Sequence, residues 1–134
     1  MSSFELVVQK AIYDKLSADL AVPVYDSVPQ SIDSGKKSDF PYISIGEDIH
    51  NTVDTDTELM NLVSITIHVW SRKEGRAETK QIQSEIYNSL HRANLVQAGY
   101  KFITITQENS TSFFDPDGHT RHGVQTFKLI IEEL

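Results

Sequence analysis

The hydrophobic residues near the start of the chain recur at the spacing of an amphipathic helix. Over residues 4–20 the apolar positions fall three or four residues apart, which places them on one helical face. Ser2, followed three residues later by Glu5, has the pattern of a capping box at a helix start. Pro23 cannot continue a helix. We therefore expect a helix over residues 4–20.

Alternation of apolar and polar residues predicts strands further along the chain. The clearest case is residues 62–70, where every second residue from Val63 to Val69 is β-branched and apolar. Further strands are expected at residues 24–25, 42–46, 100–107 and 124–131. In the strand 100–107, we expect Ile103 and Ile105 to point inward.

The strands 42–46 and 62–70 are expected to form one long antiparallel hairpin. The residues between them are polar and acidic, so the tip of this hairpin would carry Asp54, Asp56 and Glu58. A tip of this composition is typical of a solvated turn.

A second apolar stripe at helical spacing runs from Thr79 to Ala93 and predicts a helix over residues 75–93. The expected element order is α-β-β-β-α-β-β. This order predicts an α+β fold, with a mostly antiparallel or mixed sheet of about four to five strands and two helices packed on it. We expect flexible loops near residues 26–40 and 50–59. The length of 134 residues fits a single domain over residues 1–134.

Composition and charge exclude several classes of protein. The net charge is −7, with 12 Lys and Arg against 19 Asp and Glu, and the basic residues do not cluster, which argues against stable nucleic-acid binding. The chain has no cysteine, which excludes disulfides and cysteine-based metal sites. No run of about 18 apolar residues predicts a membrane span, and the start does not resemble a signal peptide. We therefore expect synthesis in a cytoplasm and no membrane contact.

One segment, residues 115–123, contains the residue types of a metal site. Asp115, Asp117, His119 and His122 offer two carboxylates and two imidazoles within eight residues. The segment lacks the bidentate glutamate of a calcium loop, because the twelfth position from Asp115 is a threonine. The Asp-Pro-Asp-Gly opening is typical of a tight turn, and we favour that interpretation.

No sequence motif of a known catalytic or nucleotide-binding site is present, and we expect no catalytic residue, cofactor or metal. Trp70, Arg72 and Arg76 form a candidate interface patch, because Trp and Arg are favoured anchors in interfaces. Residue chemistry alone thus predicts an α+β domain without an active site.

The succession of short motifs along the chain resembles the phage tail-completion family, also found in prophages and gene transfer agents. The motifs are Gln9-Lys10-Ala11-Ile12-Tyr13, Tyr25-Asp26-Ser27-Val28-Pro29, Phe40-Pro41-Tyr42, Ile67-His68-Val69-Trp70-Ser71-Arg72, Gly75-Arg76-Ala77-Glu78, Asp115-Pro116-Asp117-Gly118 and Thr120-Arg121-His122-Gly123-Val124. Each motif alone is weak, but their succession covers almost the whole chain in the same order.

The resemblance implies a structural virion protein rather than an enzyme. Proteins of this family are similar to tail terminators, in which small α+β subunits assemble as a hexameric ring on the head-proximal end of the tail. Such a ring ends tube polymerisation and joins the tail to the head. The implied partners are further copies of the chain, the tail-tube protein and the head-completion (connector) protein. DNA would pass through the lumen without specific binding.

The full set of candidate interface residues is Trp70, Arg72, Arg76, Asp117, Arg121, His122, Asp54 and Asp56. Two alternatives stay open. One is a head-side connector, an adaptor or a tube-like subunit, and the other is a metal-dependent hydrolase built on residues 115–122. We expect the protein in the virion, at the head-proximal end of the tail, after assembly in the host cytoplasm.

Overall fold

The secondary structure follows the two periodicities of the sequence. A computed structural model describes residues 4–28 and 39–134 of the chain. Its helices and strands are α1 (Phe4–Asp19), β1 (Val24–Tyr25), β2 (Tyr42–Thr52), β3 (Leu59–Ser71), α3 (Ala77–Leu90), β4 (Val96–Gln97), β5 (Tyr100–Phe114) and β6 (Arg121–Glu133). Neither helix in this part of the chain is long and apolar enough to cross a membrane.

The strands form one six-stranded sheet in the order β1-β2-β3-β6-β5-β4. β1 runs parallel to β2, and all the other neighbours are antiparallel. The α+β class, the mixed sheet and the long hairpin of β2 and β3 are confirmed. The sheet has six strands rather than four to five, because the two-residue β4 pairs with the start of β5. Val96-Gln97 has only one residue with a preference for strands, whereas Val24-Tyr25, which was predicted, has two.

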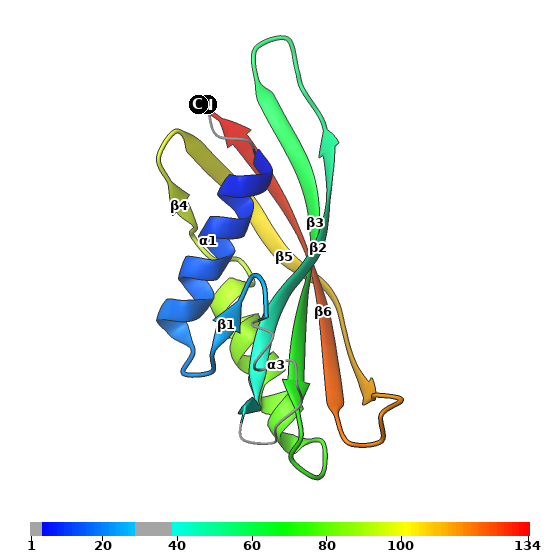
Figure 1. Cartoon of the computed structure of the whole chain (residues 1–134). Coiled ribbons are helices and arrows are strands. Elements are labelled where there is room, and N and C mark those ends of the chain that lie inside the picture. The colour runs from blue at the N-terminus through cyan, green and yellow to red at the C-terminus, as the bar shows by residue number, and fades with distance from the viewer. Residues whose placement is uncertain (1–3, 29–38) are drawn as a thin grey trace.

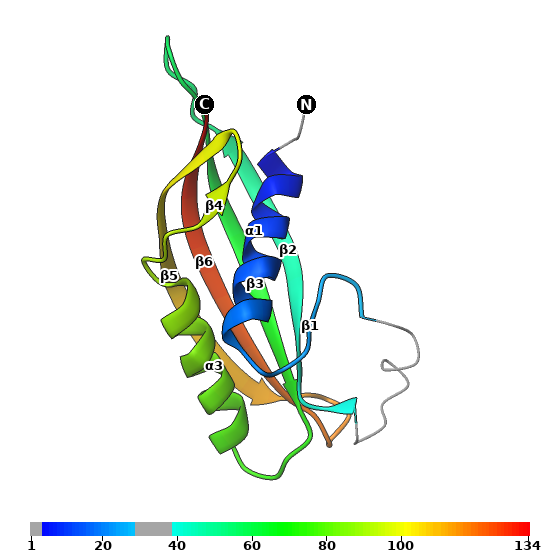
Figure 2. The same ribbon diagram turned by 90° about the vertical axis from the view of Figure 1, so that its left-hand side faces the viewer.

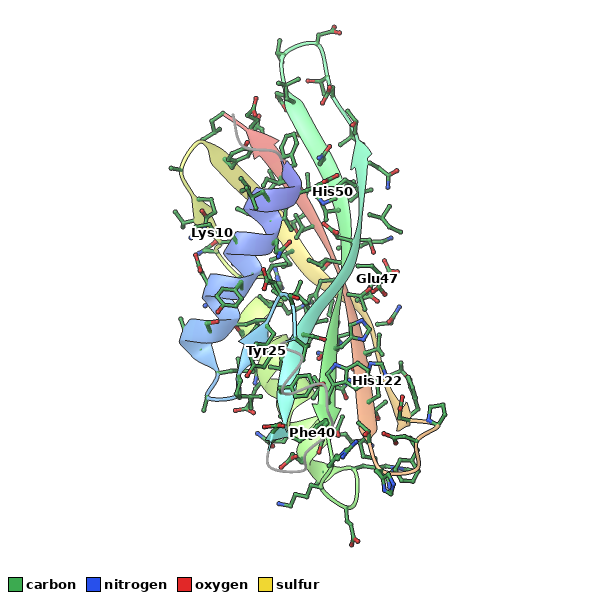
Figure 3. The ribbon with its side chains drawn as sticks, in the orientation of Figure 1. Lys10, Tyr25, Phe40, Glu47, His50 and His122 are labelled. Carbon is green, nitrogen blue, oxygen red and sulfur yellow. The ribbon has the colours of Figure 1, made fainter. Side chains whose placement is uncertain are left out.

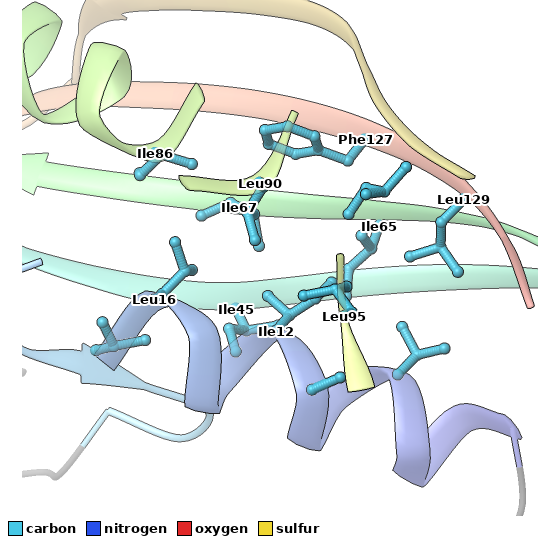
Figure 4. Packing of buried hydrophobic residues seen from close by; sticks show 14 of the residues in the cluster. Ile12, Leu16, Ile45, Ile65, Ile67, Ile86, Leu90, Leu95, Phe127 and Leu129 are labelled. Atoms are coloured by element: carbon cyan, nitrogen blue, oxygen red, sulfur yellow. The ribbon is translucent and has the colours of Figure 1, made fainter. Parts of the chain in front are cut away.

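Both helices lie on the same face of the sheet, and the opposite face has no helix over it in the described part of the chain (Figures 1 and 2). Alternate residues of β3 and β6 point toward the helices and are buried, as the pattern predicted. Figure 4 shows these side chains packed between the sheet and the helices. The largest fully buried side chains include Ile12, Leu16, Ile43, Ile65, Ile67, Ile86, Leu90, Ile105, Phe127, Leu129 and Ile131.

β5 is longer and less regular than expected. It continues beyond residue 107 to Phe114, and its pairing with β6 shifts twice, between Phe102 and Thr104 and between Gln107 and Asn109. The expectation for Ile103 is wrong: this side chain is 46% exposed, whereas Ile105 is fully buried. The first shift is the reason, because an extra residue in one strand disrupts the inward and outward alternation locally.

The tip of the β2–β3 hairpin spans residues 53–58, which is shorter than the predicted loop near residues 50–59, because pairing continues to Thr52 opposite Asn61. The tip projects beyond the rest of the sheet (Figure 1). Most of the predicted loop near residues 26–40 lies outside the described residues.

The outer strands cover only part of the edges of the sheet. β1 pairs with β2 only at Ile43 and Ser44, and β4 pairs with β5 only at Tyr100 and Lys101. Among the described residues, no strand lies beside the outer edge of β2 beyond Ser44 or of β5 beyond Lys101. The sheet thus has two partly open edges, one on each side.

The chain offers a matched pair of leucines that tests how the sheet is packed. Leu129 is fully buried, whereas Leu59 is 50% exposed. Leu129→Ala is expected to lower the free energy of unfolding by about 2–5 kcal/mol, because it removes buried methyl groups and leaves a cavity. Leu59→Ala is expected to change it by less than about 1 kcal/mol. Urea denaturation of both variants measures the difference, and equal losses would contradict this packing.

Candidate functional site

Four aromatic rings cross the helix-free face of the sheet near the start of β2. Tyr42, Trp70, His122 and Phe113 occupy directly opposite positions on β2, β3, β6 and β5. The ring centroids are 6.4 Å apart from Tyr42 to Trp70, 3.8 Å from Trp70 to His122 and 4.9 Å from His122 to Phe113. We call these four residues the aromatic row. Stacked and edge-on rings of this kind stabilise cross-strand pairs.

A second histidine, His68, lies beside the aromatic row, two residues before Trp70 on the same face of β3. His68 Nδ1 lies 2.8 Å from His122 Nε2, so the two rings share a hydrogen bond. Burial, followed by the nearby His68, holds the pKa of His122 below its ordinary value of 6.5. Gly46 makes room for this pair, because a Cβ there would come within 2.5 Å of His68 Nε2. His122 lies among the side chains of the helix-free face (Figure 3).

The turn between β5 and β6 is organised by Asp117. Its Oδ1 accepts hydrogen bonds from the backbone N–H groups of His119 and Thr120, and its Oδ2 accepts one from the Thr120 hydroxyl at 2.6 Å. These bonds, with a smaller contribution from nearby Arg72, lower the pKa of Asp117 to about 2. The predicted turn is confirmed: Gly118 has φ 77°, a conformation that favours glycine.

Two arginines flank this turn and stack on aromatic rings. Arg72 Nε donates a hydrogen bond to Thr120 Oγ1 at 3.1 Å, and its guanidinium carbon lies 4.7 Å from the ring centre of Phe40. The guanidinium carbon of Arg121 lies 4.1 Å from the ring centre of Phe114. Arg72 and Arg121 also line an open hollow of about 650 Å³. Its lining residues are Arg72, Lys73, Glu74, Gly75, Phe114, Gly118, His119 and Arg121. This end of the sheet, which we call the arginine end, therefore carries arginines and aromatic rings together with the carboxylates of Glu74, Asp115 and Asp117.

The opposite end of the sheet is acidic. The hairpin tip carries Asp54, Asp56 and Glu58, and Asp54 Oδ1 accepts a hydrogen bond from the Met60 N–H at 3.1 Å. Figure 1 places this tip and the arginine end at opposite ends of the molecule. A single subunit thus presents one acidic end and one end that carries both arginines and carboxylates.

The structure brings together five of the eight candidate interface residues. Trp70, Arg72, Asp117, Arg121 and His122 lie at or next to the arginine end. The remaining three are Arg76, at the exposed start of α3, and Asp54 and Asp56, at the acidic tip.

Sequence analysis did not select Phe40, Tyr42 or Phe113 as site residues. Tyr42 and Phe113 join the aromatic row only through the register of three strand pairs, from β2 to β5. Aligning the β5–β6 hairpin from its turn would have placed Phe113 opposite His122. The same procedure fails for Tyr42, because the register shift between Ile45 and Asp48 lies between it and the β2–β3 turn.

The geometry does not support the alternative of a metal site in residues 115–122. Among the residues that the structure describes, no group of three or more His, Asp or Glu side chains is arranged to hold a metal ion. Both carboxylate oxygens of Asp117 already accept hydrogen bonds within the turn. This turn is therefore a structural element.

Asp117→Ala is expected to lower the stability at neutral pH, because it removes three hydrogen bonds from the turn. A carboxylate with a depressed pKa contributes stability above its unfolded value of 3.8 that is lost as the pH falls toward about 2. The variant should therefore lose less stability than the parent chain over that interval. Thermal unfolding at stepped pH measures this, with Asp115→Ala as the control, and a parallel loss in all three proteins would refute it.

The lowered pKa of His122 predicts a second dependence of stability on pH. Because its pKa is lower in the folded chain, the unfolded chain binds the proton more readily, and stability falls as the pH drops below about 6.5. His122→Gln is expected to reduce the loss of stability between about pH 7.5 and about pH 5.5. His119→Gln, which removes an imidazole from the exposed turn and leaves the aromatic row intact, is the control. Chemical denaturation at the two pH values provides the measurement.

Comparison with known proteins relates this chain to phage tails. It is 28% identical over 124 residues to the tail completion protein gp17 of Bacillus phage SPP1, an alignment that covers 92% of this chain and 90% of that protein. Its fold matches a chain in the virion of a native gene transfer agent particle with a TM-score of 0.84 and 20% sequence identity, covering 98% of this chain and 99% of that chain.

A model of one protein family, described as tail completion protein gp17, matches residues 10–132. Since this match extends over most of the 134 residues, the chain belongs to the tail completion protein gp17 family.

Proposed function

We propose that this protein is a structural, non-catalytic subunit of a phage tail that forms a hexameric ring on the head-proximal end of the tail tube. The ring ends tube polymerisation and joins the tail to the head-completion (connector) protein. Family membership supports a role in tail completion. The protein would assemble in the host cytoplasm and stay in the virion.

The observation that carries this proposal is the difference between the two ends of the subunit. The arginine end offers a basic hollow with aromatic rings, whereas the hairpin tip offers Asp54, Asp56 and Glu58. In a ring whose strands cross from one side of the ring to the other, every subunit presents one end on each side. Two sides of different chemistry suit two different partners, which is what a protein between tube and connector requires.

The acidic tip and the hollow lined by Arg72, Lys73 and Arg121 also favour a second candidate, a tube-like subunit. In that case the acidic tip of one copy would bind the basic hollow of the next, and the protein would polymerise by itself. A terminator forms one ring and stops. Sedimentation of the isolated chain at increasing concentration separates the two functions, because only a tube-like subunit yields filaments.

The terminator function predicts the outcome of a reconstitution experiment. The cognate tail-tube protein is polymerised with and without this chain and examined by negative-stain microscopy. The expected result is shorter tubes that carry an extra ring at one end. Tubes of unchanged length without added density would contradict the terminator function.

Charge-reversal variants test, in the same assay, which end of the subunit binds the tube and which end joins the head. The variants are Arg72→Glu with Arg121→Glu at the arginine end, and Asp54→Lys with Asp56→Lys at the tip. One pair is expected to abolish binding to tubes, and the other is expected to leave tube binding intact and abolish joining to heads. Circular dichroism serves as the folding control. Loss of both activities in both folded variants would contradict the assignment of separate partners to the two ends.

A further inference from the structure

We propose that neighbouring copies of this chain join by β-sheet pairing between the two partly open edges. Residues 48–52 of β2 in one copy would pair antiparallel with residues 110–114 of β5 in the next, with the helices on the outside. This inference rests on the proposed ring and specifies its lateral contact.

The first argument is where the edges are open. β1 covers β2 only at Ile43 and Ser44, so the half of β2 near the hairpin tip has no strand beside its outer edge among the described residues. β4 and the residues after α3 cover the other half of β5: Arg92 N–H donates to the Ile105 carbonyl, and Gln107 N–H donates to His91 Nδ1. The open segments thus lie at opposite ends of opposite edges.

These open edges carry few of the features that usually prevent pairing, and their one charged side chain, Asp48, is paired with His50 at 2.7 Å. Segments 48–52 and 110–114 contain neither proline nor lysine, which commonly protect edge strands. The register shift in β2 lies between Ile45 and Asp48, and the one nearest in β5 lies between Gln107 and Asn109. Both segments are therefore free of bulges. Since β2 and β5 run in opposite directions within the sheet, copies placed side by side pair them antiparallel.

The offset between the two segments agrees with the geometry of a closed barrel. Within one copy, Ile49 of β2 pairs with Ser64 of β3, which in turn pairs with Lys128 of β6. Phe113 of β5 pairs with His122, which lies six residues from Lys128 along β6. Pairing Ile49 with Phe113 of the next copy therefore requires a stagger of about 20 Å over four strands, which span about 19 Å. This corresponds to a strand tilt of about 45°, at the upper end of the usual range for barrels.

The handedness of the tilt determines which face is outside. Figure 2 shows the helical face, with β2 at the right-hand edge and its hairpin end at the top. Because strands twist right-handed, barrel strands seen from outside lean to the right as they rise, and the next copy to the right is shifted upward along them. The upper half of β2 then meets the lower half of β5. With the helices inside, the same tilt would join the halves that β1 and β4 already cover.

The proposed register also brings two exposed hydrophobic residues together. Ile49 is 62% exposed and Phe113 is 46% exposed, and both belong to the helix-free face. As direct cross-strand neighbours between copies they would shield each other from water, and aromatic and β-branched pairs favour such positions. The contact joins different surfaces of two identical chains, which is the kind of contact that closes a ring.

With the helices outside, the helix-free face lines the lumen. Between the aromatic row and the hairpin this face carries the hydroxyl side chains of Ser64, Thr66, Thr106 and Thr126. Its Lys128 is paired with Glu108 at 2.8 Å. Since these hydroxyl groups are neutral and Lys128 is paired, this part of the face offers few cations to bind phosphates, so DNA would pass it without being held.

Because the chain has no cysteine, engineered disulfides provide a direct test. The proposed register places Asn51 opposite Thr111 of the next copy, at a Cα separation of about 4.5–5.5 Å, which a disulfide spans. The test variant carries Asn51→Cys and Thr111→Cys, and the control carries Asn51→Cys and Thr104→Cys. All three positions are exposed. Both variants are oxidised in solution and on cognate tail tubes, and the products are separated on non-reducing gels.

The expected result is a ladder of covalent oligomers up to the closed ring in the test variant and little cross-linking in the control. If both variants cap tubes but the test variant gives no more product than the control, edge pairing is wrong and the terminator function stands. If the ladder forms but tubes are not capped, the terminator function is wrong and edge pairing stands. Failure of both measurements overturns both proposals.

Discussion

Alternate side chains of β3 and β6 pack against α1 and α3, and this contact determines the rest of the structure. Residues such as Ile65 and Phe127 are removed from water between the sheet and the helices. Burial of apolar area is the main favourable term in folding, so the sheet needs only one covered face to be stable. The intervening positions, from Leu62 to Trp70 on β3, are left free to carry other chemistry.

The sequence predicts this packing well because β3 and β6 alternate and each helix has an apolar stripe. The buried positions of α1, β3 and β6 follow directly from those patterns. Ile103 was mispredicted because a bulge depends on how two strands pair, which the pattern of one strand does not contain. The two-residue β4 was missed because it is held by pairing with β5 rather than by its own sequence.

The candidate surfaces were only partly predictable, because they too depend on how the strands pair. Residue type indicated Trp70, Arg72 and Arg121 as candidates, and the turn motif indicated Asp117. Their common location, however, depends on the register of the strands. Trp70 and His122 are 52 positions apart in the chain and stack at 3.8 Å because β3 and β6 pair. Asp117 illustrates the opposite case, since its residue type suggested a ligand while its hydrogen bonds show a turn.

The two faces of the sheet also constrain the evolution of the chain differently. A substitution at a buried position such as Leu129 must conserve volume, whereas one at Ser64 or Thr126 meets solvent and leaves the core unchanged. Sequences can therefore drift on the helix-free face while the backbone stays the same. A chain of a gene transfer agent particle has the same fold, with a TM-score of 0.84 at 20% identity. A fold with one covered face therefore tolerates many substitutions on its other face without a change in the backbone.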